Sequence, residues 1–239
     1  MNSILVKPWD PEACHALFMT SILVAISAFG AFPSCERYNT FQPIDGLIDI
    51  FVLARGMHAI LRSSEEAIRK GPLGKAMVGC DCKRETPFDC LAIITPQLNA
   101  LLAHFEEQTF DLTEDKRKTL VKTVGALIEI AARNKGIMSV KEQRLIFGWP
   151  MEFPSTFLTL LRNKDPLAMV ILSYYCVLLR SAETKCWYFE GWSSALMEVI
   201  ITSIASTPFE RLIQWPIETI DNMARISVKR KSTGVPNAI

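Results

Sequence analysis

The sequence predicts an all-α fold, with residues 1–239 forming a single domain built as a bundle of about eight helices. Two observations lead to this prediction. Apolar residues follow helical spacing in one segment after another, and no useful length of chain alternates as a strand would. In addition, 239 residues with 49% hydrophobic content are enough to bury one large core.

Charge and cysteine content restrict the classes of partner. The net charge is +1, so the chain lacks the basic footprint of a nucleic-acid-binding domain, and we expect no direct nucleic-acid partner. The seven cysteines are odd in number, which favours reduced thiols in an intracellular protein of the cytoplasm or nucleus. Cys80, Cys82 and Cys90 form a cluster without the spacing of a common zinc site, so we predict no metal and no cofactor.

The first predicted helix starts at Asp10-Pro11-Glu12, which supplies a cap, a proline at the first position and an acid in the first turn. It runs to about Phe29. Its uncharged segment, residues 16–32, is short for a membrane span and lacks the basic start of a signal peptide. We therefore predict a buried amphipathic helix and no membrane span.

The middle of the chain carries four further helix signals. A second helix opens at Pro43 and continues past Leu61, with Phe51 on its apolar side, before a loop. Thr95-Pro96 starts a third helix, and caps and apolar spacing predict two more at 113–133 and 139–147. Gly148-Trp149-Pro150 is then predicted to form a hinge.

The C-terminal part is predicted to hold helices at 155–162, 166–179, 189–204 and 207–215. Pro216 is expected to break the last of these helices. Residues 227–239 are predicted to form a flexible tail.

The segment from Asp165 to Trp192 is the one around which we interpret the rest of the chain. Asp165 and Pro166 predict a helix start, and the helix that follows is uncharged to Leu179 and apolar on all faces, as buried helices are. After a short polar break come four aromatic residues, Trp187, Tyr188, Phe189 and Trp192. This sequence suits the wall of an apolar pocket; the alternative is simply the central helix of an all-α core.

Common catalytic motifs are missing from the sequence: there is no phosphate loop, no nucleophile elbow and no His-Glu-x-x-His. The sequence does contain several tyrosine and tryptophan residues, each of which has a large apolar ring and one hydrogen-bonding group. Such residues suit a hydrophobic ligand with a single hydroxyl or carbonyl group. We predict that a hydrophobic small molecule is bound by Tyr174, Tyr175, Leu178, Trp187, Trp192 and Phe51.

A set of short motifs in residues 154–192 also points to a known family. These motifs are Pro154, Arg162, Asp165-Pro166, the aliphatic and aromatic run Tyr175 to Leu179, Trp187 and Glu190-Gly191-Trp192, with Trp215-Pro216, Arg55-Gly56 and residues 13–32 as weaker matches. The segment resembles the regulatory domain of fungal zinc-cluster transcription factors of the sterol uptake control type. The resemblance implies an all-α domain around an apolar pocket for a sterol or terpenoid. The six closely spaced cysteines of that family's DNA-binding module are not present here.

Three functional hypotheses follow. The first is a regulator-derived domain that binds a sterol or terpenoid-like molecule. The second is a cofactor-independent cyclase or pericyclase of fungal secondary metabolism, which would act by folding a polyene or terpenoid into a reactive shape. The third is a structural relative that acts through a homodimer.

Overall fold

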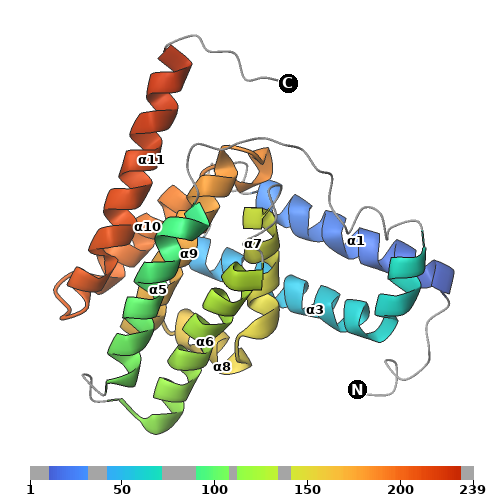
Figure 1. Cartoon of the computed structure of the whole chain (residues 1–239), viewed down its shortest axis with the longest axis horizontal. Helices are drawn as coiled ribbons and strands as arrows, with labels where there is room; N and C mark the ends of the chain where they lie inside the picture. Colours follow the sequence, from blue (N-terminus) through green and yellow to red (C-terminus); the bar gives the residue numbers. More distant parts are fainter. Residues whose placement is uncertain (1–10, 32–41, 72–89, 108–111, 134–140, 233–239) are drawn as a thin grey trace.

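The computed structural model describes residues 11–31, 42–71, 90–107, 112–133 and 141–232 (Figure 1). Within these ranges the chain forms nine α-helices and two short 3-10 helices and contains no strand, which confirms the all-α prediction. The helices are α1 (Pro11–Gly30), α3 (Pro43–Lys70), α5 (Cys90–Glu106), α6 (Glu114–Arg133), α7 (Lys141–Glu152), α8 (Ser155–Arg162), α9 (Pro166–Glu183), η2 (Trp187–Phe189), α10 (Trp192–Ile204), η3 (Glu210–Ile213) and α11 (Gln214–Ser232).

Helix α9 is the centre of the fold. It packs against α5, α6, α7, α8, α10 and α11, and every side chain from Leu167 to Leu179 is buried. Its start is the predicted one, because the Asp165 carboxylate accepts from the backbone N–H groups of Leu167 and Ala168, at 3.1 and 3.3 Å. Lys116 of α6 forms an ion pair with the same carboxylate. Asp165 therefore fixes both the first turn of α9 and its position against α6.

Helix α3 forms the next layer, and α1 lies outside it. Helix α3 contacts α7, α8 and α10 on one side and α1 on the other, whereas α1 packs on α3 and on η2 (Figure 1). One side of α1 is buried through Cys14, Phe18, Ala25 and Phe29. Its other side is exposed but carries no charged residue from Ala16 to Gly30, so it is not the polar face that the predicted amphipathic helix would have.

The predicted hinge at Gly148-Trp149-Pro150 is wrong, because these residues belong to α7. The Trp149 side chain is fully buried, and its indole N–H donates to the Thr123 carbonyl oxygen of α6 at 3.0 Å. Burial of the largest side chain outweighs the local preference of glycine and proline for a turn.

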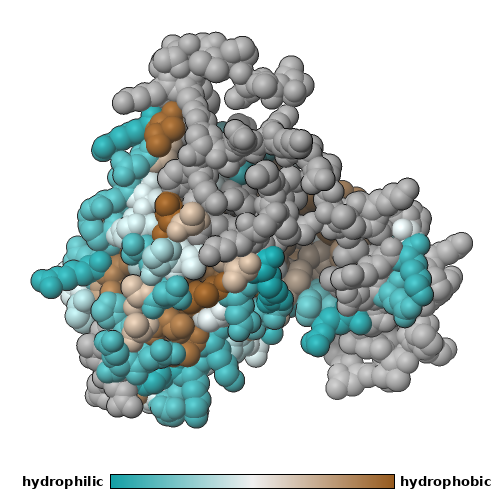
Figure 2. Space-filling view, in the orientation of Figure 1, coloured by the Kyte–Doolittle hydropathy of each residue, from teal (hydrophilic) through white to brown (hydrophobic). Residues whose placement is uncertain are grey.

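The predicted end at Pro216 is also wrong, since Pro216 lies in the first turn of α11, where a proline costs no hydrogen bond. Helix α11 then runs to Ser232, so residues 227–232 of the predicted tail are helical, and 233–239 lie outside the described residues. In Figure 1 its C-terminal end projects beyond the other helices. Figure 2 shows small groups of hydrophobic residues between hydrophilic ones over the left-hand helices.

Among the described residues one helix, Pro166–Glu183, is long and apolar enough to cross a membrane. Most of this helix is buried within the protein, and a core helix meets the same two criteria. The apolar part of α1, Cys14–Gly30, is shorter.

Candidate functional site

Two of the predicted ligand-binding residues, Phe51 and Tyr175, meet in the interior. Their rings contact edge to face, with centroids 5.5 Å apart, and Tyr175 stacks on Trp149 at 4.9 Å. Both side chains have no exposed surface. Phe51 and Tyr175 therefore lie where α3, α7 and α9 pack together.

The Tyr175 hydroxyl has a specific partner in this cluster. It donates to the Ile146 carbonyl oxygen of α7 at 3.0 Å. In a regular helix that carbonyl would accept from the N–H of the residue four positions later, but that residue is Pro150, which has no N–H. Tyr175 thus supplies the hydrogen bond that Pro150 removes, and burial raises the pKa of its phenol well above the usual value.

The hydroxyl of Tyr174, the preceding residue of α9, also donates to a backbone carbonyl. Its acceptor is the Leu212 carbonyl oxygen of η3, at 3.1 Å. The ring stacks on Trp215, with centroids 5.6 Å apart. Burial raises the pKa of Tyr174 to about 12, so its phenol stays protonated and keeps donating at neutral pH.

Leu178 and Trp192 are also buried. The Trp192 indole N–H donates at 2.9 Å to the Phe29 carbonyl oxygen, which lies in the last turn of α1 where helical carbonyls lack a partner. The Trp192 ring contacts Phe29 edge to face. The polar groups of Tyr174, Tyr175 and Trp192 are therefore bonded to backbone carbonyls of neighbouring helices.

Trp187, the sixth predicted residue, lies at the surface. Its side chain is 70% exposed, the highest value among the large apolar side chains described. The ring lies across Gly30, where an added Cβ would come within 2.9 Å of Trp187 Cζ3. A glycine at the end of α1 is thus what lets the indole approach that helix so closely.

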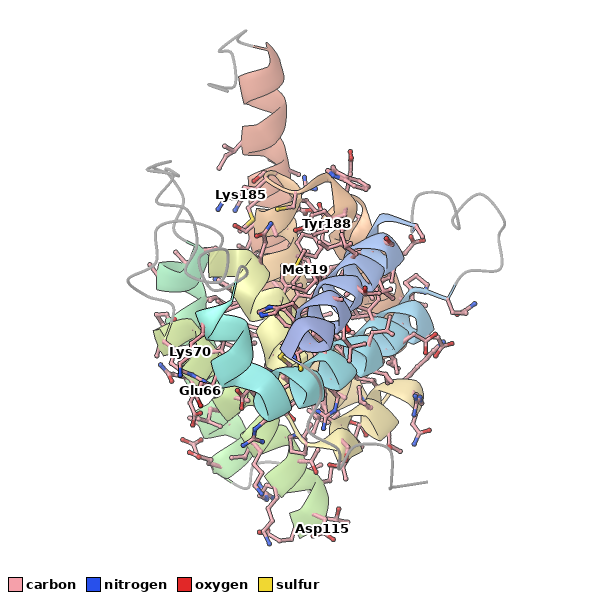
Figure 3. The ribbon with its side chains drawn as sticks, turned by 90° about the vertical axis from the view of Figure 1, so that its right-hand side faces the viewer. Met19, Glu66, Lys70, Asp115, Lys185 and Tyr188 are labelled. Atoms are coloured by element: carbon pink, nitrogen blue, oxygen red, sulfur yellow. The ribbon has the colours of Figure 1, made fainter. Side chains whose placement is uncertain are left out.

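An apolar strip leads along α1 to this indole. Met19, Leu23, Ile26 and Gly30 follow each other at spacings of four, three and four residues, which places them on one side of the helix. We refer to these four residues as the α1 strip. The Leu23 side chain is 56% exposed and the Met19 side chain 37% exposed. Met19 and Tyr188 are both labelled in Figure 3.

Three polar side chains meet next to Trp187. The Gln143 amide nitrogen Nε2 donates to Tyr188 Oη at 2.8 Å and also to the Cys186 thiol. Burial, followed by the neighbouring Cys186 thiol, raises the pKa of the Tyr188 phenol well above its usual value. We refer to Gln143, Cys186 and Tyr188 as the polar trio.

The α1 strip, Trp187 and the polar trio together form the candidate site. The Tyr188 ring contacts Trp187 edge to face at 5.8 Å and Phe189 at 4.5 Å, so the trio is bordered by aromatic surface. Such a combination can hold an apolar molecule that carries one polar group. The sequence could not indicate Gln143, because it lies more than forty positions before Tyr188 and no motif links the two.

Within the part of the chain that the structure describes, no three His, Cys, Asp or Glu side chains are grouped to hold a metal ion. Of the cysteine cluster, Cys80 and Cys82 lie outside the described residues, and Cys90 is buried at the start of α5. In comparisons with protein-family models, curated proteins and solved structures, no match to this chain is found.

Proposed function

We propose that this protein binds an elongated hydrophobic small molecule, of the sterol or terpenoid kind, along the α1 strip with Trp187 at one end. The observation that carries the proposal is the uncharged outer side of α1 running directly into a tryptophan that is 70% exposed. Single exposed apolar residues need no explanation, whereas a contiguous series of them is typical of binding surfaces.

The dimensions of the strip support a ligand of this size. Met19 and Gly30 are eleven positions apart in one helix, so the strip is roughly 16 Å long at a rise of about 1.5 Å per residue. Covering each 100 Å² of apolar surface would contribute about 2.5 kcal/mol before the cost of association. A molecule with several fused or linked apolar rings has a suitable length and width.

The contacts behind the strip support a regulatory role for binding. Phe29 precedes Gly30, contacts Phe189 and Trp192 edge to face, and accepts the hydrogen bond of Trp192. A ligand bound to the α1 strip would therefore lie next to the place where α1, η2 and α10 pack together. The resemblance of residues 154–192 to a regulatory domain agrees with this role.

Binding is tested with an environment-sensitive apolar dye and with native mass spectrometry of the purified protein. We expect Trp187→Ala and Leu23→Asp each to weaken dye binding at least about tenfold, because one removes the aromatic surface and the other places a charge in the strip. The matched control is Ile226→Asp, which puts the same charge on an exposed apolar residue of α11.

Unchanged binding in both strip variants would refute the proposal. Size-exclusion chromatography separates it from the homodimer hypothesis. A dimer in the wild type that Leu23→Asp converts to a monomer would show that a second copy of the chain, rather than a small molecule, covers the strip.

A further inference from the structure

The backbone of Gly30 does not require a glycine. Glycine commonly ends a helix in the left-handed conformation, but among the described residues Gly191 is the only glycine with a positive φ. Gly30 is the last residue of α1, and an alanine there would suit the helix better, because glycine destabilises helices relative to alanine. The reason for a glycine at this position therefore lies in a contact.

That contact is made by the outer ring of Trp187. A Cβ added at position 30 would lie 2.9 Å from Cζ3 and 3.1 Å from Cη2 of the indole, and 3.6 Å from the Cβ atom of Tyr188. The first two distances are shorter than an ordinary contact between carbon atoms, so the indole would have to move. The contact with Tyr188 would be an ordinary one. A side chain at position 30 thus acts on the position of Trp187.

Stability of the fold does not account for this contact. The Trp187 side chain is 70% exposed, so its contact with Gly30 leaves most of the indole in water. Trp149 and Trp192 are buried instead, and their N–H groups donate to backbone carbonyls. An indole that is seated on a helix and still open to solvent has the properties of a residue that contacts a ligand.

We infer, on the basis of the proposed function, that Gly30 is a positioning residue of the candidate site, which holds Trp187 at the end of the α1 strip. Because position 30 has no side chain, the indole lies next to the surface formed by Met19, Leu23 and Ile26. A ligand then meets helix and indole in one arrangement, which lowers the cost of ordering the ring on binding. A larger residue at position 30 moves Trp187 away although every apolar side chain of the site is kept.

The experiment compares Gly30→Ala with Gly56→Ala in binding of the apolar dye. Gly56 lies in α3 with no atom within 4 Å of an added Cβ, so it is the matched control for exchange of a helical glycine. Gly30→Ala should weaken dye binding at least about fivefold, because the indole is displaced, while urea denaturation shows that the protein stays folded. Gly56→Ala should bind the dye as the wild type does. Gly30→Ser adds the same Cβ and repeats the test.

A second background tests whether the effect acts through the indole. Phenylalanine lacks the outer ring atoms that meet position 30, so adding Gly30→Ala to Trp187→Phe should change dye binding by less than about twofold. Equal weakening in both backgrounds, or no weakening in the wild-type background, would overturn the positioning role alone, since Trp187→Ala tests the proposed function separately. Failure of the wild type to bind the dye would overturn both.

Discussion

Tyr175 and Pro150 act as a complementary pair of residues. Pro150 leaves the Ile146 carbonyl without its helical partner, and the buried Tyr175 hydroxyl donates to that carbonyl from another helix. A buried carbonyl without a hydrogen bond costs more than the bond itself contributes. The pair allows α7 to contain a proline without that cost.

This pairing predicts a rescue between two substitutions. Tyr175→Phe should lower the free energy of unfolding by about 2 kcal/mol, because it leaves the Ile146 carbonyl buried and unbonded. Adding Pro150→Ala restores an N–H four residues after Ile146, so the double variant should regain most of that loss. Urea denaturation of the four proteins in the cycle measures the coupling.

Additive effects in this cycle would contradict the pairing. Tyr174→Phe combined with Pro150→Ala is the matched control, since Tyr174 donates to Leu212 of a different element, and these two changes should add without coupling.

The sequence could indicate that these tyrosines matter but not for what purpose. A ring with one polar group suits a ligand with a carbonyl and suits equally well a backbone carbonyl of a neighbouring helix. The partners of Tyr174 and Tyr175 lie 38 and 29 positions away along the chain. Only the packing of the helices decides which oxygen each hydroxyl meets.

At the scale of helices, the corner between α9 and α10 depends on one carboxylate. Glu183, in the last turn of α9, accepts from the Ser193 backbone N–H at 2.9 Å and from Arg180 at 2.8 Å. Gly191, which precedes α10, has no side chain to cap it and a φ of 87°, a conformation that favours glycine. Glu183 therefore takes the place of a cap and stabilises the positive end of α10.

Substitutions of Glu183 should separate the contribution of its hydrogen bond to Ser193 from the contribution of its negative charge. Glu183→Ala removes the acceptor and the ion pair and should destabilise the protein by about 2 kcal/mol. Glu183→Gln keeps an oxygen for the Ser193 N–H and should cost less. Thermal unfolding distinguishes them, with the exposed Glu198→Ala of α10 as the control. Equal losses in the Ala and Gln variants would show that the charge alone matters.

A helix start could be predicted from the sequence where a capping residue precedes a proline at the first helical position, but not everywhere. The start predicted at Thr95-Pro96 is wrong, because α5 begins at Cys90 and contains Pro96, and the buried side chains of Cys90, Ile94 and Leu98 continue one helix face across it. Asp165 with Pro166 gives a local chemical reason to begin a helix, and α9 begins there. Trp149 shows why the hinge prediction failed, since its burial against α6 depends on residues far away in the chain. In the candidate site, Trp187 was selected from its aromatic type, but its close approach to α1 depends on Gly30 of that helix.

At the scale of the whole molecule, buried phenols link stability to alkaline pH. The pKa of Tyr174 is raised from 10.0 to about 12, and burial also raises the pKa values of Tyr175 and Tyr188. Below pH 10 the phenols are protonated in both the folded and the unfolded chain, so their contribution to stability is complete. As the pH rises above 10, the unfolded chain loses protons that the folded chain keeps, and stability falls.

The free energy of unfolding should therefore decrease between pH 10 and 12, by about 1.4 kcal/mol per pH unit for each such tyrosine. Urea denaturation at pH 9, 10 and 11 measures this slope. Tyr174→Phe should make the slope shallower, whatever its effect on stability at pH 9. A slope that is the same in the variant would show that Tyr174 does not contribute.

The pair of Tyr175 and Pro150 also constrains how this sequence can diverge. If Pro150 is replaced by a residue with an N–H, the hydroxyl of Tyr175 becomes dispensable. Phenylalanine at position 175 should then be tolerated only where the proline at position 150 is gone. Coupled substitutions at two positions 25 residues apart would thus mark related chains that share this helical packing.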